Sequence, residues 1–97
     1  MTAPALEAAA ARMRVIAARI EGVIASYLDP AVRLLPQVWI GPAADQLELE
    51  MLGHRASLLT VAANLRSRAN GLDGQAAEIR AGEAALAANS ESFAGAI

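Results

Sequence analysis

The segment Trp39-Ile40-Gly41-Pro42-Ala43 separates two long stretches rich in Ala and Leu. It contains the only tryptophan, and an indole ring on a loop needs packing because it exposes a large apolar area while its N–H needs a partner. Gly41 favours the end of one helix, and Pro42 favours the first turn of the next. The segment therefore predicts a W-x-G turn, formed by Trp39, Ile40 and Gly41, between two helices.

The composition favours helices over strands. At 97 residues, the chain fits one small domain, 1–97, whose lone core supplies little net stability. Apolar residues make up 56% of the chain, but 25 of them are alanine, a strong helix former with little side chain to bury. The aromatic residues are only Tyr27, Trp39 and Phe93. We therefore expect an all-α domain of thin, closely packed helices.

Several classes of function are disfavoured by the same composition. The formal charge of −2 and the scattered arginines provide no basic surface for nucleic acid. The absence of cysteine excludes disulfides and thiol chemistry. No run approaches the ~20 apolar residues of a membrane span, and the first residues do not resemble a signal peptide. The many alanines, with no lysine, are typical of a high-GC, actinobacterial-like genome.

Before the turn, apolar residues alternate spacings of four and three, which predicts a heptad-patterned helix over about 5–35. Pro30 interrupts this pattern and predicts either a kink or, with Asp29 as N-cap, a short second segment that Pro36 ends. In both cases we expect the heptad phase to continue through Pro30. The predicted seam of this helix is Leu6, Ala10, Met13, Ala17, Ile20, Ile24, Tyr27, Ala31, Leu34 and Val38.

After the turn, which is expected at 36–41, the pattern predicts a second helix over about 42–88 that starts at Pro42. Gly71 and Gly74 weaken its interior, but we expect it to continue through them. Residues 89–97 have no period and are expected to form a flexible tail. The predicted seam of this helix is Leu47, Met51, His54, Leu58, Val61, Leu65, Arg68, Leu72, Gln75, Ile79, Gly82 and Leu86, with Leu52, Leu59, Ala62, Ala69 and Ala76 beside it.

Two such helices with a short connection form an antiparallel two-helix hairpin. Each helix hides only the stripe that it turns toward the other, so the remaining apolar side chains need a partner. The sequence therefore predicts dimerisation into a four-helix bundle. The residues expected in the hairpin core and partner interface are Met13, Ile20, Ile24, Tyr27, Leu34, Leu47, Met51, Leu58, Val61, Leu65 and Arg68.

The chain resembles the W-x-G family of type VII secretion, the small helical-hairpin proteins similar to the early secreted antigenic targets of mycobacteria. The resemblance depends on Trp39 and Gly41 near the middle of about one hundred residues, the heptads on both sides, and the lack of cysteine and of a signal peptide. It covers about residues 5–88. It implies a hairpin that dimerises with a sister protein or with the helical domain of an effector. It also implies export from the cytoplasm to the cell surface or medium by a membrane ATPase.

One feature departs from that family. Many members, or one member of each pair, have a Tyr-x-x-x-Asp/Glu signal after the second helix, whereas the only tyrosine here is Tyr27, in the first helix. The simplest explanation is that a partner supplies this signal. The chain would then act as substrate, co-substrate or targeting adaptor, and would reach the secretion ATPase through its partner.

Single residues leave alternatives open. Trp39 either contacts the secretion machinery or a partner, or caps the hairpin's own core. Arg68, on the predicted seam, favours a different protein as partner, with an acid opposite it, or else lies at a solvated edge. His54 is the only histidine and is not expected to bind metal, which needs three or four ligands. We expect no catalysis and no cofactor, because the chain has no nucleophile–base set and no phosphate-binding loop.

Two other functions stay open at the level of the sequence. The helices could act as membrane-active amphipathic segments, although acids slightly outnumber bases, whereas such helices usually have basic polar faces. The chain could also be a purely structural homodimer.

Overall fold

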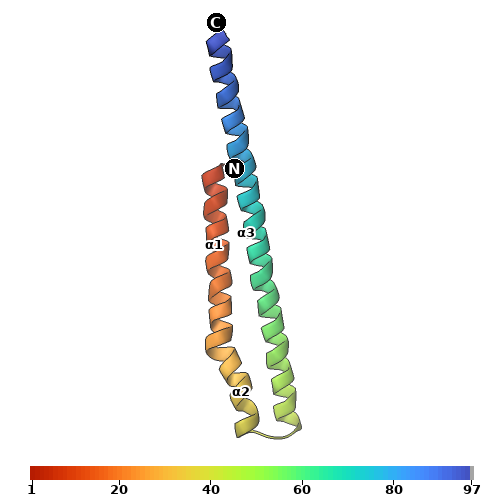
Figure 1. Ribbon diagram of the computed structural model, residues 1–97. Coiled ribbons are helices and arrows are strands. Elements are labelled where there is room, and N and C mark those ends of the chain that lie inside the picture. Colours follow the sequence, from red (N-terminus) through yellow and green to blue (C-terminus); the bar gives the residue numbers. More distant parts are fainter. Residues whose placement is uncertain (97) are drawn as a thin grey trace.

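The computed structural model describes the backbone of residues 1–96 and the side chains of residues 1–91. Its elements are α1 (Ala3–Val23), the π-helical turn η1 (Ile24–Leu28), α2 (Asp29–Val38) and α3 (Pro42–Ala96). Within residues 1–96 there is no strand, which confirms the all-α prediction. The first arm consists of α1, η1 and α2, and the second arm is α3. The two arms meet at one end of a rod that measures 85 × 17 × 16 Å (Figure 1).

The first arm begins with a side-chain cap. The hydroxyl of Thr2 accepts a hydrogen bond of 3.3 Å from the backbone N–H of Ala5, which satisfies one of the free donors of the first turn. Pro4 lies in that turn, where its missing N–H costs nothing. The cap explains why α1 begins at Ala3, slightly before the expected residue 5.

The π-helical turn η1 interrupts the first arm just before Pro30. The N–H of Asp29 bonds to the carbonyl of Ile24, five residues back, so this turn contains one residue more than an α-helical turn. Pro30 has no N–H for the carbonyl of Ser26, and its ring would clash there in a regular helix, which the wider turn relieves. Asp29 is the first residue of α2 and not its N-cap. The expectation that the heptad phase continues unchanged is therefore wrong, because the phase moves by one residue.

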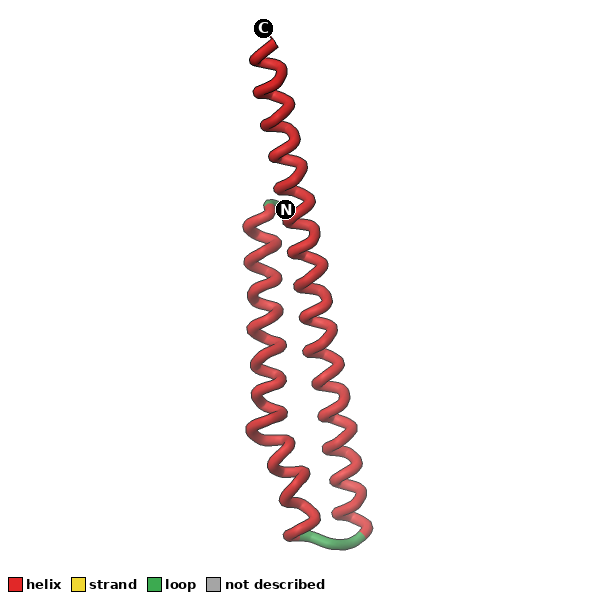
Figure 2. Tube along the Cα trace, in the orientation of Figure 1, coloured by secondary structure: helices red, strands yellow, loops and turns green. Residues whose placement is uncertain are grey.

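The connection between the arms is shorter than expected. Pro36 lies inside α2, which ends at Val38, so residues 39–41 form the connection that was expected at 36–41 (Figure 2). Trp39 is extended, with φ −149° and ψ 130°. Gly41 has φ 132°, a value that residues with a Cβ rarely adopt.

α3 begins at Pro42, the expected residue, and is longer than the sequence predicts. It continues through Gly71 and Gly74 without a break. It also includes residues 89–96, where we expected a flexible tail, and the last residue of that tail, Ile97, lies outside the described residues. The end of α3 extends past the start of α1 (Figure 1).

The two arms lie side by side and run in opposite directions. Three ion pairs connect α1 to α3, and each step of seven residues forward on α1 corresponds to a step of seven back on α3. They are Glu7–Arg80, Arg14–Asp73 and Glu21–Arg66. Their side chains are all more than a third exposed, so each pair contributes at most about 1 kcal/mol and serves mainly to define the register.

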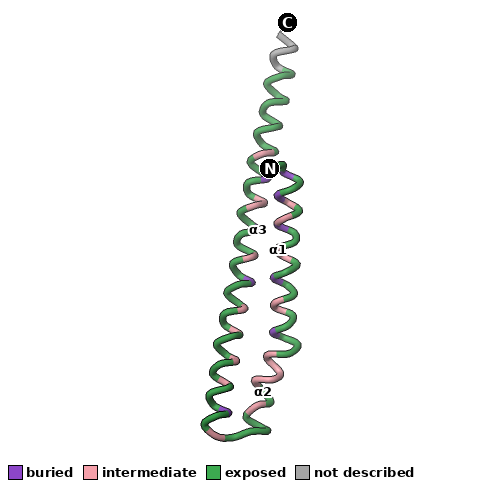
Figure 3. The backbone as a smooth tube through the Cα atoms, turned by 180° about the vertical axis from the view of Figure 1, so that it is seen from behind, coloured by how far each residue is buried: buried purple, intermediate pink, exposed green. Residues whose placement is uncertain are grey.

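The core is a narrow seam between the arms, and it consists mainly of alanine. Buried positions recur along the sides on which α1 and α3 face each other (Figure 3). Because an alanine side chain is a single methyl group, two alanine-rich faces bring their helix backbones close together. The buried residues are Ala3, Leu6, Ala10, Ala17, Ile24, Ala44, Ala62, Ala69 and Ala76.

Candidate functional site

The described residues offer a surface and no enclosed site. No polar or charged residue among them is buried, and no three His, Cys, Asp or Glu side chains of this part of the chain are placed to hold a metal ion. His54, the only histidine, is exposed on α3. The candidate site is therefore an apolar surface, and its extent follows from the heptad positions that the seam leaves uncovered.

The eleven residues predicted for the hairpin core and partner interface divide into two groups. Six of them are buried or half-buried between the arms: Met13, Ile20, Ile24, Met51, Leu58 and Leu65. The other five are exposed: Tyr27, Leu34, Leu47, Val61 and Arg68. The second group is available to a partner, whereas the first is largely used by the chain itself.

On the first arm, the extra residue of η1 causes this division. Leu28 and Leu35 are half-buried, one position later than the predicted Tyr27 and Leu34. Tyr27, Leu34 and Val38 are 73%, 55% and 76% exposed, respectively. The π-helical turn thus rotates three predicted seam residues out of the seam and onto the surface.

On α3, every second residue of the observed seam lies one position after the predicted seam residue. Met51, Leu58, Leu65, Leu72 and Ile79 belong to both seams, but the residues between them are Ala62, Ala69 and Ala76 and not Val61, Arg68 and Gln75. The signal that identifies this choice is an alanine at every seventh residue over three successive heptads of each arm. The alanines are Ala3, Ala10 and Ala17 in the first arm and Ala62, Ala69 and Ala76 in the second.

The seam has two edges, and the ion pairs identify one of them. Three residues of α1 directly follow a seam residue: Glu7, Arg14 and Glu21. Their partners on α3 also directly follow seam residues. The ion pairs between them place these positions on one edge of the seam, which we call the ion-pair edge. Asp29 and Arg55, 2.7 Å apart between Oδ1 and Nε, continue it beyond η1.

Positions that directly precede the seam residues lie on the opposite flank of each helix, and in an antiparallel pair these flanks meet on the second edge. We call this second side the apolar edge. Its apolar members are Ile16, Val23, Tyr27, Leu34 and Val38 from the first arm, and Leu47 and Val61 from α3, all exposed.

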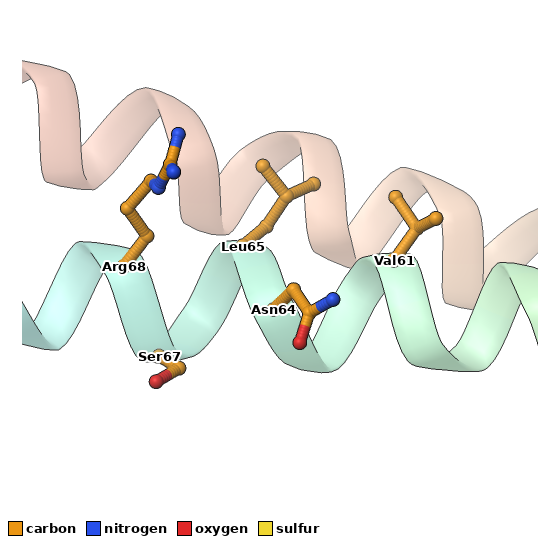
Figure 4. A pocket seen from close by; sticks show the side chains of 5 residues that line it. All are labelled: Val61, Asn64, Leu65, Ser67 and Arg68. Atoms are coloured by element: carbon orange, nitrogen blue, oxygen red, sulfur yellow. The ribbon is translucent and has the colours of Figure 1, made fainter.

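The close view of α3 shows the arrangement of side chains along this edge. Val61, Leu65 and Arg68 rise on the side of α3 that faces the first arm, whereas Ser67 lies on the opposite side of the helix (Figure 4). Together with Asn64, these residues line a shallow depression. An aliphatic floor beside a guanidinium group suits a partner helix that presents both apolar and acidic side chains.

The first arm contributes a second depression to the apolar edge. It is lined by Ala11, Arg12, Val15, Ile16 and Arg19. Arg12 and Arg19 directly precede the seam residues Met13 and Ile20, which places them on the apolar-edge flank of α1. Both arms therefore present arginine next to aliphatic side chains on this edge.

The connection between the arms exposes more apolar area. Ile40 is 89% exposed, and Trp39 is 46% exposed. Trp39 is thus partly packed and partly available to a partner. Leu35, Pro36, Trp39, Ile40, Ala44, Asp45 and Glu48 line a small depression at this end.

Comparison of the chain with known protein families, with curated proteins and with solved structures found no match. In residues 1–96, no helix has both the length and the apolar character needed to cross a membrane.

Proposed function

We propose that the chain is a helical-hairpin interaction protein whose apolar edge binds the helices of a partner to form a four-helix bundle. The proposed activity is binding, with no catalysis and no cofactor. The partner class is another W-x-G hairpin or the helical domain of a secreted effector. The edge residues already named, together with seam residues that stay half-exposed, are expected to contact that partner.

The observation that supports this proposal is the distribution of apolar side chains. Among the residues whose side chains are described, nine are buried and seven of these are alanine, whereas fifteen large apolar side chains are exposed. Seven of these fifteen lie on the apolar edge, where contact with water costs about 25 cal/mol per Å² relative to burial. A second pair of helices would cover the apolar edge along its whole length.

The cellular role that we propose is in type VII secretion, as substrate, co-substrate or targeting adaptor. It is supported by the resemblance at Trp39 and Gly41 and by the location of these residues between two long helices. Because no Tyr-x-x-x-acid signal follows in the sequence, we propose that the partner carries it to the secretion ATPase. The chain would then fold in the cytoplasm and leave the cell with its partner.

The proposal is tested by co-expressing the tagged chain with the short helical proteins encoded beside its gene. The mass of the purified complex is measured by light scattering, and export is measured in the culture medium. Val61→Asp places a charge on the apolar edge, whereas Leu49→Asp changes an equally apolar, exposed residue of α3 outside that edge. We expect loss of complex and export with Val61→Asp only. A chain that stays monomeric with every neighbour, or is exported equally well in both variants, overturns the proposal.

A further inference from the structure

Two arginines on the apolar edge, one on each arm, have no acid to pair with in the described part of the chain. Arg19 and Arg68 are exposed, and none of the ion pairs among residues 1–91 includes either of them. The pairs Arg14–Asp73 and Glu21–Arg66 fix the register of the arms, and this register places Arg68 at the level of Arg19. The edge therefore has two positive charges at one level, on opposite helices.

The nearest acids of α3 on the same flank are distant along the rod. Glu50 and Glu78 are 18 and 10 residues from Arg68, respectively, which corresponds to about 27 and 15 Å at ~1.5 Å per residue. Both distances exceed the screening length of about 8 Å at physiological ionic strength. On the first arm, the residues that precede the seam positions include no acid between Arg12 and Val38. The centre of the apolar edge is therefore basic.

Resting on the proposed function, we infer that the partner is a different protein whose docking helix has an apolar stripe flanked by carboxylates at the level of Arg19 and Arg68. Such a helix covers the aliphatic side chains of Ile16, Val23 and Val61 and pairs with both guanidinium groups. Arginine suits this role because its planar, always charged group binds carboxylates in two-point geometry.

A second copy of the chain does not meet this requirement. In a two-fold contact, a surface patch meets the same patch of the other copy. With the rods parallel, Arg19 faces Arg68 of the other copy. With the rods antiparallel, Arg19 faces its own counterpart, because it lies near the middle of the first arm. Like charges brought together in an interface favour a different partner over a homodimer.

Two synthetic helical peptides test the inference with the full-length chain. Both have the same leucine stripe, and the stripe is flanked by glutamate in one peptide and by lysine in the other. Fluorescence anisotropy at low salt is expected to show at least about tenfold tighter binding of the glutamate peptide. Arg68→Glu and Arg19→Glu should each remove this preference. The matched control is Arg33→Glu, an exposed arginine beside the Asp29–Arg55 pair on the ion-pair edge, which should retain it.

The outcomes separate this inference from the proposed function. Equal binding of the two peptides, absence of binding to either, or an equal effect of Arg33→Glu overturns the acidic partner. A stable dimer of the chain alone that Val61→Asp dissociates also overturns it. The proposed function is judged by the separate co-expression and export assay, so it can survive any of these results. Circular dichroism of each variant shows that helix content is retained.

Discussion

The guanidinium Nη1 of Arg14 lies 2.6 Å from Oδ2 of Asp73, and Nη2 of the same group donates a hydrogen bond of 2.8 Å to Oδ1 of Asn70. One side chain of α1 therefore contacts two residues of α3 that are almost one turn apart. This contact lies near the middle of the ion-pair edge and fixes the alignment of the two arms. A shift of the arms by one helical turn would remove the three ion pairs between α1 and α3.

Reversal of the charge of Arg14 tests this alignment. Arg14→Asp places two carboxylates together, and we expect the free energy of unfolding to fall by about 1 kcal/mol or less, since the pair is exposed. The double variant Arg14→Asp/Asp73→Arg should recover most of this loss in urea unfolding followed by circular dichroism. Arg12→Asp, which changes an arginine outside the ion pairs, is the control. A double variant no more stable than Arg14→Asp would contradict the register.

The π-helical turn predicts an unusual response to deletion. Removal of Tyr27 takes away the extra residue of η1, so that Leu28 and Leu35 regain heptad spacing with Ile24 as a regular helix. Because Pro30 would then clash with the carbonyl four residues back, the deletion is made in a Pro30→Ala background, where we expect the melting temperature to stay within about 4 °C of that of Pro30→Ala alone or to rise. Deletion of Ala18, in regular α1, shifts every later seam residue onto another face and should lower the melting temperature by more than about 8 °C. Equal losses in the two deletions would be inconsistent with the observed phase shift.

The alanine seam predicts that larger side chains separate the arms. Ala69 is fully buried, so Ala69→Leu forces the backbones apart and should cost about 1–3 kcal/mol of unfolding free energy. Ala63→Leu, at an exposed position of the same helix, should change stability by less than about 0.5 kcal/mol. Urea unfolding measures both values. If Ala69→Leu were the more stable of the two variants, the close approach of α1 and α3 at this position would be wrong.

Gly41 predicts a cost that arises from the backbone alone. An added Cβ would meet nothing within 4 Å, but φ is 132°, so Gly41→Ala should lower stability by about 1–2 kcal/mol through strain. Gly53→Ala provides the comparison, because Gly53 lies inside α3 with equally open surroundings and should gain up to about 1 kcal/mol. Thermal unfolding should therefore move in opposite directions for the two variants. A gain at Gly41 would show that the connection relaxes to another conformation.

The sequence predicts where the helices lie along the chain better than it predicts which side of each helix is buried. Pro42 and Gly41 mark the start of α3, and the heptads indicate both helices, because each of these signals is local. The choice between Val61 and Ala62 as the seam neighbour of Leu65 is not local: it depends on how closely two helices approach, and therefore on alanines in both arms. The more hydrophobic Val61 was the wrong choice for the seam and is the better candidate for a partner.

The displacement of Tyr27 has a different origin. A prediction from hydrophobic spacing assumes that each residue of a helix adds a rotation of about 100°. One wider turn before Pro30 changes the face of every later residue of the arm. Proline predicts a disturbance at this position but does not determine whether the helix bends, stops or gains a residue. The local sign was that Leu28 and Leu35, seven residues apart, offer a second pair of seam positions one residue after Tyr27 and Leu34.

The extended shape of the molecule has a practical effect on its hydrodynamics. A globular domain of this length has a radius of gyration of about 13 Å, whereas that of this chain is 23.3 Å. A rod with these dimensions tumbles slowly about its short axes and enters the pores of a gel poorly. The monomer will therefore elute as a globular protein of several times its mass, and early elution from a column does not by itself indicate a dimer.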